Sequence, residues 1–426
     1  MSDNNEKIIV KGNGPLKGKV KISGAKNSAL PILAACLLGT EDIILSEVPK
    51  LKDIEIMLEV LKSLGSEITY LDDTTIKINS KNINSYETPF ELMDKMRASF
   101  VVMGPLLARF NKTKTKSPGG CNIGKRPVDL HLKGFKSLGA KTVQDHDEIS
   151  AVAENGLKGA IIYLDFPSVG ATQNIMMAAT MAKGETVIEN AAKEPEIVDL
   201  SNFLTKMGAK IRGAGTSIIT IEGVEKLTGT NHAIIPDRIE AATYMIAAAM
   251  TKGDVVIENV IGAHIRPVIA KLIEVGATVE ESKDEDIIRV KADKRLNGTT
   301  IKTLPYPGFP TDAQAQFMAL MSICNGESRV KETVFENRFM HVDELVKMGA
   351  SVLTEGNEAA ILGVDKLKGA NVKATDLRAG AALVMAGLVA EGETVISDIY
   401  HIDRGYSDIV GKFRNLGANI KRVKVD

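Results

Sequence analysis

Residues 61–66 read Leu61-Lys62-Ser63-Leu64-Gly65-Ser66, and this short pattern returns five more times along the chain. Each copy ends an apolar, helix-like stretch with a hydrophobic residue, a glycine and a small residue, and a strand-like segment follows. Glycine suits a helix end because the residue there takes a left-handed conformation, which costs other residues about 1 kcal/mol. The six glycines stand about 70 residues apart, at Gly65, Gly139, Gly208, Gly276, Gly349 and Gly417. This period favours a compact βαβ-type unit over a solenoid repeat, so we predict six similar modules, grouped three and three.

A second element recurs in several modules. It is a helix rich in Ala and Met, followed by a glycine and a β-branched strand. Such helices lack a wide polar stripe, so we expect them to be buried in the centre of each domain. They span Ile175 to Met181, Ala241 to Met250 and Ala379 to Ala390, before strands that follow Gly184, Gly253 and Gly392.

Length and module count predict two domains. A chain of 426 residues exceeds one ordinary core. A polar stretch from Val224 to Asn231 precedes Pro236, and we place a hinge near Ala233 to Pro236. The predicted domains are residues 27–235 and residues 1–26 plus 236–426. The opening segment, Ile8 to Ile22, has no clear partner in the first half and could close either domain.

Composition limits the function classes. A net charge of −1 argues against nucleic acid as a partner, because such binding needs many uncompensated Lys and Arg residues. We find no secretory signal and no stretch able to span a bilayer, and the three cysteines lie far apart, which disfavours disulfides. The six histidines show no zinc-binding spacing. We therefore expect a cytoplasmic protein without a membrane partner or metal site, with a monomer as the working expectation for its oligomeric state.

The loop Ser117-Pro118-Gly119-Gly120-Cys121-Asn122-Ile123-Gly124-Lys125-Arg126 is the sharpest local motif. Its glycines and prolines indicate irregular backbone, and Lys125 and Arg126 favour the thiolate of Cys121. The alternative is a buried structural cysteine, but a Gly-Gly-Cys loop is a poor place to bury a side chain. Cys36 and Cys324 lie in apolar helical stretches, and we assign those two to the core.

Basic residues also recur where modules join, next to predicted helix starts or ends. Any one of them could be an ordinary surface ion pair. A guanidinium beside a helix N-terminus, however, makes a clamp for phosphate or carboxylate, and the recurrence favours two domains facing one polyanionic ligand. These residues are Lys26 (beside Asn27), Arg97, Arg126, Arg338, Arg378 and Arg404.

The segment Gly308-Phe309-Pro310-Thr311-Asp312-Ala313-Gln314 offers a carboxylate among these cations. Thr311 or Asp312 could simply cap the following helix, which is the default interpretation. In a cleft rich in Arg and Lys, Asp312 becomes a candidate general base.

Taken together, these motifs resemble those of the enolpyruvyl transferases, and within that family the members that act on UDP-N-acetylglucosamine. The resemblance implies α/β architecture: a two-domain inside-out α/β barrel, with three βαβαββ modules around buried central helices in each domain and the active site in the cleft between domains. It covers the chain from about Ile8 to the C-terminus. The segments that carry it are Ser23 to Asn27, Pro118 to Cys121, Arg126 to His131, Phe309 to Asp312, Glu332 to His341 and Tyr400 to Tyr406.

The resemblance implies transfer of the enolpyruvyl group of phosphoenolpyruvate to the 3-hydroxyl of UDP-N-acetylglucosamine, with release of phosphate. This reaction is the first committed step towards peptidoglycan, the cell-wall polymer tied to cell shape, division and the cell cycle. Neither a metal nor an organic cofactor is implied. The site must hold two anionic substrates together, supply one proton and accept another.

Residue roles also follow from the resemblance. Asp312 would accept the proton of the 3-hydroxyl or orient that group. Cys121 would lie on a closing lid, as proton donor to C3 or as the nucleophile of a covalent adduct, and would be the residue that fosfomycin alkylates. Phosphoenolpyruvate would be bound by Lys26, Arg126 and Arg404, with Arg338 and Arg378 close by. The sugar nucleotide would be lined by Asn27, Arg97, Ser168, Val169, Gly170 and Val334.

The chain departs from the family at Phe166-Pro167, where members can carry a basic residue. Two alternatives remain open. One is the sister enzyme 3-phosphoshikimate 1-carboxyvinyltransferase, whose lid lacks this Gly-Gly-Cys arrangement. The other is a non-catalytic paralogue that binds the sugar nucleotide without turnover, which would not need a base and a reactive thiol.

Overall fold

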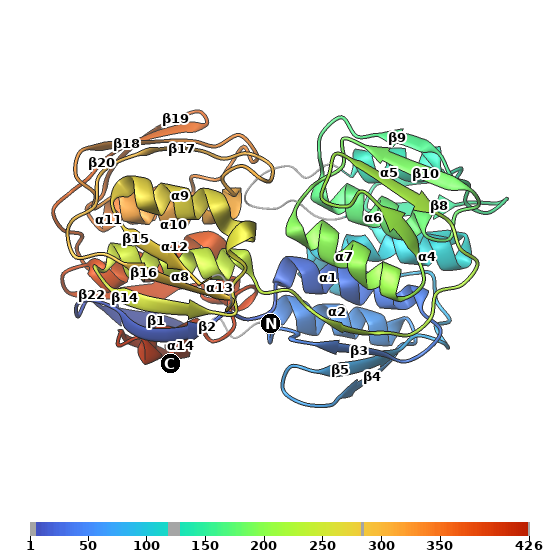
Figure 1. Cartoon of the computed structure of the whole chain (residues 1–426), viewed down its shortest axis with the longest axis horizontal. Helices are drawn as coiled ribbons and strands as arrows, with labels where there is room; N and C mark the ends of the chain where they lie inside the picture. The colour runs from blue at the N-terminus through green and yellow to red at the C-terminus, as the bar shows by residue number, and fades with distance from the viewer. Residues whose placement is uncertain (1–5, 118–127, 283–284, 425–426) are drawn as a thin grey trace. The chain divides into compact units, whose positions relative to one another are not determined.

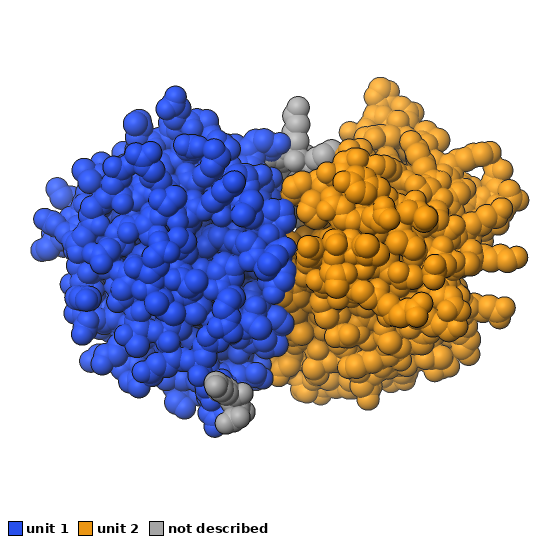
Figure 2. All heavy atoms as spheres, turned by 45° about the horizontal axis from the view of Figure 1, so that its top comes forward, with its two compact units in different colours: residues 1–23, 121–125, 236–426 blue, residues 24–120, 126–235 orange. Residues whose placement is uncertain are grey.

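A computed structural model describes residues 6–117, 128–282 and 285–424 of the chain. These residues form two compact units, which Figure 2 shows in different colours. Unit 1 holds residues 6–23 and 236–424, and unit 2 holds residues 24–117 and 128–235. The chain therefore passes between the units after Ser23 and again after Ile235.

Unit 2 contains three successive modules, labelled in Figure 1. The first comprises α1 (Lys26–Ala35), η1 (Cys36–Leu38), β3 (Ile43–Ser46), α2 (Lys52–Ser63), β4 (Glu67–Tyr70) and β5 (Ile76–Asn79). The second comprises α3 (Phe90–Lys95), η2 (Arg97–Val102), α4 (Met103–Phe110), β6 (Lys112–Lys116), α5 (Asp129–Ser137), β7 (Lys141–Asp145), β8 (Glu148–Val152) and β9 (Ile161–Tyr163). The third comprises α6 (Val169–Ala179), β10 (Glu185–Glu189), α7 (Pro195–Lys206), β11 (Lys210–Arg212), β12 (Ile218–Glu222) and β13 (Asn231–Ala233).

Unit 1 begins with β1 (Glu6–Lys11) and β2 (Lys17–Lys21), and its three modules follow after unit 2. The fourth module comprises α8 (Arg238–Met250), β14 (Asp254–Glu258), η3 (Gly262–Ile265), α9 (Arg266–Val275), β15 (Thr278–Glu281), β16 (Ile287–Lys291) and β17 (Thr300–Lys302). The fifth comprises η4 (Thr311–Ala313), α10 (Gln314–Met321), β18 (Glu327–Lys331), α11 (Val342–Lys347), β19 (Ser351–Glu355), β20 (Glu358–Leu362) and β21 (Asn371–Lys373). The sixth comprises α12 (Leu377–Val389), β22 (Glu393–Ser397), α13 (Tyr400–Asp403), α14 (Ile409–Asn415) and β23 (Asn419–Lys424).

The repeated glycine ends a helix in every module, as predicted. All six glycines have left-handed backbone, with φ between +86° and +108°. In the first copy, the N–H of Gly65 donates to the carbonyl of Lys62 and the N–H of Ser66 donates to that of Leu61. The other five copies repeat this pair of bonds, which satisfies carbonyls at the helix end.

The central helices are buried on all sides. Every residue of α10 is buried, as is every residue of α8 after Arg238. The outer helices, such as α2, keep one exposed face. Each unit has its own hydrophobic core, built around α8, α10 and α12 in unit 1 and around α1, α4 and α6 in unit 2.

The sheets lie outside the helices, as Figure 1 shows for α8, α10 and α12 among the sheets of unit 1. Strand β18 buries alternate residues, so one face of its sheet packs inward and the other meets solvent. The predicted inside-out α/β arrangement with buried central helices is therefore confirmed. Among the described residues the strands form six separate small sheets, and none of these closes into a barrel.

The opening segment completes unit 1. Strand β1 lies between β22 and β23 and is antiparallel to both, while β2 pairs in parallel with β14. The sixth module ends at β23, and β1 takes the place that β20 has in the fifth module. In unit 2, β13 closes the set by pairing in parallel with β3.

No helix in the described part of the chain combines the length and the apolar character needed to cross a membrane.

Candidate functional site

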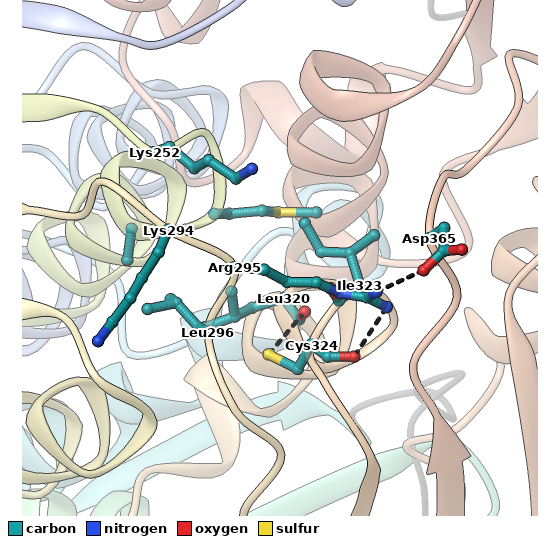
Figure 3. Close-up of a pocket in the computed structure, with 10 residues that line it drawn as sticks. Lys252, Lys294, Arg295, Leu296, Leu320, Ile323, Cys324 and Asp365 are labelled. Carbon is teal, nitrogen blue, oxygen red and sulfur yellow. Dashed lines mark hydrogen bonds and ion pairs between the residues drawn. The ribbon is translucent and has the colours of Figure 1, made fainter.

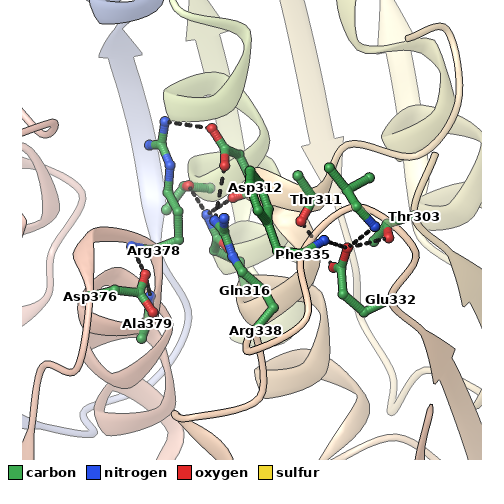
Figure 4. Close-up of polar contacts among 12 residues, drawn as sticks. Thr303, Thr311, Asp312, Gln316, Glu332, Phe335, Arg338, Asp376, Arg378 and Ala379 are labelled. Atoms are coloured by element: carbon green, nitrogen blue, oxygen red, sulfur yellow. Dashed lines mark hydrogen bonds and ion pairs between the residues drawn. The ribbon is translucent and has the colours of Figure 1, made fainter. Parts of the chain in front are cut away.

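Asp312 is held between two buried arginines of unit 1. Nη2 of Arg338 lies 2.9 Å from Oδ1 of Asp312, and Nη2 of Arg378 lies 3.4 Å from Oδ2 (Figure 4). Both arginine side chains are only 3% exposed, whereas that of Asp312 is 27% exposed. The carboxylate is thus the solvent-accessible member of a charged cluster.

Asp312 lies in η4, directly before α10. Asp237 and Asp376 stand at comparable places before α8 and α12, and both accept backbone N–H groups of their helices. Asp312 instead stands out by its two pairs with Arg338 and Arg378.

The two arginines of the cluster keep donors that Asp312 does not use. Nη1 of Arg338 and Nη1 of Arg378 are buried and have no hydrogen-bond partner among the described residues. Burial by itself would lower the pKa of Arg378, but the charges of Tyr406, Asp312 and Asp237 raise it above its ordinary value. Two buried guanidinium groups against one carboxylate leave donors available for a further anion.

The N-termini of the central helices meet beside this cluster. Gln316, in the first turn of α10, donates to Oγ1 of Thr243 on α8 at 3.2 Å and to the hydroxyl of Tyr406 at 3.1 Å. Arg378 lies in the first turn of α12, with its guanidinium carbon 5.3 Å from the ring centre of Tyr406. Helix N-termini carry partial positive charge, so their convergence adds to the attraction for anions.

The opposite ends of α8 and α10 line a small cavity of about 80 Å³. Figure 3 shows Arg295 across it, bonded to Asp365 and to the carbonyl of Cys324. Arg295 also donates to the carbonyls of Ile323 and Val364, so its guanidinium is already satisfied by the protein. We assign no ligand to this cavity.

Two further predicted residues lie in unit 1. Val334 is half-buried in the segment after β18, and its N–H donates to Oε1 of Glu332 at 2.8 Å. Arg404 is half-buried directly after α13. Burial and the charge of Arg404 lower the pKa of the neighbouring His401.

In unit 2, Lys26 begins α1 and is almost fully buried. Its Nζ lies 2.6 Å from Oδ2 of Asp53, in the first turn of α2. Asn27 follows it and is half-buried. The pair with Asp53 holds this buried ammonium in a fixed position.

The predicted segment Ser168, Val169 and Gly170 forms the start of α6. Ser168 caps the helix by accepting the N–H of Ala171. Gly170 faces His131, because a Cβ added there would lie 3.2 Å from the imidazole ring. His131 is fixed in turn by Asn174, whose Nδ2 lies 3.0 Å from Nδ1. Small residues thus leave the helix N-terminus open beside an oriented imidazole.

Three predicted site residues lie outside the described residues: Cys121 and Arg126, together with the side chain of Arg97. The other two cysteines are buried, as predicted. Burial raises the pKa of the Cys324 thiol to about 12 and that of Cys36 further, so neither is a reactive thiol. Within the described part of the chain, no group of three or more His, Cys, Asp or Glu side chains could hold a metal ion.

Sequence reasoning missed two buried carboxylates next to the points where the chain leaves each unit. In unit 1, Glu240 accepts the N–H of Ser23 at 2.7 Å and pairs with Nζ of Lys412 at 2.6 Å. In unit 2, Asp199 accepts from the hydroxyl of Ser28 and the N–H of Ile235. Their partners lie far away in sequence, so no local pattern indicates them.

Comparisons with known proteins identify the family of the chain. The model of the family described as EPSP synthase (3-phosphoshikimate 1-carboxyvinyltransferase) matches residues 10–413. Among solved structures, the enolpyruvyl transferase NikO from Streptomyces tendae has a TM-score of 0.88 at 22% identity and covers 99% of each chain. EPSP synthase from Acinetobacter baumannii has a TM-score of 0.77 at 20% identity, over 98% of this chain and 100% of that one. At these identities the two structures support the fold alone.

Curated relatives are much more similar in sequence. A UDP-N-acetylglucosamine 1-carboxyvinyltransferase from Finegoldia magna is 69% identical over 99% of this chain and 100% of its own length. Relatives of the same name from Carboxydothermus hydrogenoformans and Staphylococcus aureus are 59% and 53% identical, over 98% of this chain and 99% of their own lengths. The chain therefore belongs to the UDP-N-acetylglucosamine 1-carboxyvinyltransferases, within the EPSP synthase family of enolpyruvyl transferases.

Proposed function

We propose that this protein transfers the enolpyruvyl group of phosphoenolpyruvate to the 3-hydroxyl of UDP-N-acetylglucosamine and releases phosphate. The observation that carries the proposal is the cluster at Asp312, where one accessible carboxylate sits between two buried guanidinium groups with unused donors. A reaction between two anionic substrates needs both features: cations that hold the anions and a group that accepts a proton.

In the proposed mechanism, the 3-hydroxyl oxygen attacks C2 of phosphoenolpyruvate while C3 gains a proton. The hydroxyl proton passes to Asp312, and the product of this step is a tetrahedral adduct. Loss of a proton from C3 then restores the double bond as the C2–O bond to phosphate breaks. The two pairs with Arg338 and Arg378 orient the Asp312 carboxylate for its role.

Lys26, Arg126 and Arg404 bind phosphoenolpyruvate in this proposal, with Arg338 and Arg378 supplying further positive charge. Asn27, Arg97, Val334 and the N-terminus of α6 at Ser168, Val169 and Gly170 bind the sugar nucleotide. Cys121 protonates C3 or forms a covalent adduct, and the same thiol makes the protein sensitive to fosfomycin. The role in peptidoglycan synthesis and the cytoplasmic location belong to the same proposal.

The test is release of phosphate from phosphoenolpyruvate, with UDP-N-acetylglucosamine and shikimate 3-phosphate offered in separate reactions. We expect release only with the sugar nucleotide. Release with shikimate 3-phosphate instead would assign the sister activity. Binding of the sugar nucleotide without any phosphate release would indicate a non-catalytic paralogue.

A further inference from the structure

Glu332 is a buried carboxylate that the proposed mechanism does not use. It follows β18 directly and is 2% exposed. Its Oε1 accepts the hydroxyl of Thr303 at 2.8 Å and the N–H groups of Val334 and Phe335 at 2.8 and 3.2 Å. Its Oε2 accepts the hydroxyl of Thr311 at 2.9 Å. Four neutral donors therefore converge on one buried charge (Figure 4).

These contacts connect two segments that both carry proposed site residues. Thr311 immediately precedes Asp312 in η4, and Val334, which is proposed to line the sugar nucleotide, donates its N–H to Glu332. Thr303 reinforces the connection, because its hydroxyl accepts the N–H of Thr333 while its carbonyl accepts the hydroxyl of Thr333. A buried carboxylate thus links the Asp312 turn directly to the Val334 turn.

We propose that Glu332 is a positioning residue, which fixes the Asp312 carboxylate relative to the Val334 backbone so that both engage the sugar-nucleotide acceptor together. This inference rests on the proposed function, in which both residues serve that substrate. Phosphoenolpyruvate is held mainly by other residues. A defect at Glu332 therefore weakens use of the sugar nucleotide more than binding of phosphoenolpyruvate, because a small misplacement of reacting groups costs a large factor in rate.

The Glu332→Gln variant isolates the contact to Thr311. The amide oxygen can replace Oε1 and accept the same three donors, whereas the amide NH₂ can only donate to the Thr311 hydroxyl, so this contact loses its charge and reverses its direction. Thr311→Val removes the same contact from its other end, and Thr311→Ser keeps the hydroxyl. Glu358→Gln is the matched control, since it neutralises an exposed glutamate of the same sheet that pairs with Lys331.

We expect Glu332→Gln and Thr311→Val each to lower kcat/KM for UDP-N-acetylglucosamine about tenfold, with KM for phosphoenolpyruvate changed by less than about twofold. The double variant should lose no more than the worse single variant, because both changes act on the same contact. Thr311→Ser and Glu358→Gln should behave like the wild type, and the thermal midpoint of Glu332→Gln should stay close to that of the wild type.

An active wild type with unaffected Glu332→Gln and Thr311→Val variants would overturn the positioning role alone. Losses of kcat/KM that multiply in the double variant would also overturn it. Equal losses of kcat/KM for both substrates, together with a lowered thermal midpoint, would overturn it as well, because they indicate a general structural role. A wild type that releases no phosphate from the two substrates would overturn the proposed function and this inference with it.

Discussion

At the scale of single residues, Asp312 balances part of the charge of two buried arginines. The Arg338 and Arg378 side chains are almost fully buried, and Asp312 is the carboxylate bonded to both of them. Removing one partner of a buried ion pair leaves an uncompensated charge, which is costly. The exposure of Asp312 reduces that cost, because solvent screens its charge.

We predict that Asp312→Asn lowers kcat about 100-fold or more, because an amide cannot accept the hydroxyl proton. Both substrates should still bind, since the arginines remain and gain unpaired donors. Phosphate release and calorimetric titration with each substrate measure the two effects. Asp365→Asn is the control, because it neutralises an exposed partner of Arg295 elsewhere in unit 1. Full turnover by Asp312→Asn would refute the proton-accepting role.

His341 gives unit 1 a stability that depends on pH. It is completely buried, and neither ring nitrogen has a hydrogen-bond partner in the described part of the chain. Burial lowers its pKa to about 4; the charge of Asp376 opposes this shift and that of Arg338 adds to it. An unfolded histidine has a pKa of about 6.5. Between these values the unfolded chain binds a proton that the native protein excludes, so stability falls as the pH falls.

We therefore predict that His341→Gln reduces the loss of unfolding free energy between about pH 6.5 and pH 4, by up to roughly 1.4 kcal/mol per pH unit. Urea denaturation at several pH values measures the unfolding free energy of the variant and of the wild type. Taking the difference between the two removes the contribution of the carboxylates, because both proteins share it. His146→Gln, at a side chain that is 96% exposed, provides the control. Parallel pH profiles of the His341 variant and the wild type would contradict the prediction.

Part of the site could be predicted at this scale and part could not. Asp312, Arg338 and Arg378 stand in recognisable local motifs, and the structure places them in direct contact. Glu332 stands within such a motif, but no local pattern indicates its bonds with Thr303 and Thr311. Gln316 and Tyr406 touch across 90 positions of sequence, and only the packing of three modules creates that contact.

At the scale of elements, the helix-ending glycine is a backbone requirement rather than a packing requirement. A Cβ added to Gly208 would meet no atom within 4 Å, and its φ is +108°. We predict that Gly208→Ala lowers the free energy of unfolding of unit 2 by about 1 kcal/mol, and Gly208→Asn by less, because asparagine tolerates left-handed backbone better. Urea denaturation, monitored by hydrogen exchange of α7 and β11, measures the unfolding free energy of both variants. Equal stability of the alanine variant and the wild type would show that the conformation carries no cost.

Elements were predictable where one local rule dominates. The glycine cap and the apolar helices each follow from short sequence windows, and the structure confirms both. The helix starts were harder, since Asp237, Asp376 and Asp312 stand in similar contexts. The first two accept backbone N–H groups of their helices, whereas the third pairs with Arg338 of its own module and with Arg378 of the sixth module. A local pattern contains no information about these two pairs.

At the scale of the whole molecule, the position of the opening strands could not be predicted. In the sixth module β23 pairs with β1, so the second strand of its hairpin comes from the other end of the sequence. Ile8 and Val10 of β1 are completely buried in the core of unit 1. A segment with no helical period and no neighbour in sequence gives no indication of which sheet it joins.

This closure predicts the outcome of moving β1. A chain lacking residues 1–11 should lose hydrogen-exchange protection in β22 and β23, because both strands lose their shared neighbour. Strands β3 and β5 of unit 2, which do not pair with β1, serve as the internal control.

A permuted chain tests the same closure from the other direction. Glu6 pairs with Lys424, so residues 6–11 attached after Lys424 through a two-residue turn should restore the sheet. The turn Gly356-Asn357 joins β19 to β20 in the fifth module in the same way and can be copied. The permuted chain should regain protection in β22 and β23 and release of phosphate from phosphoenolpyruvate. Full protection in the truncated chain, or none in the permuted chain, would show that β1 does not complete the sixth module.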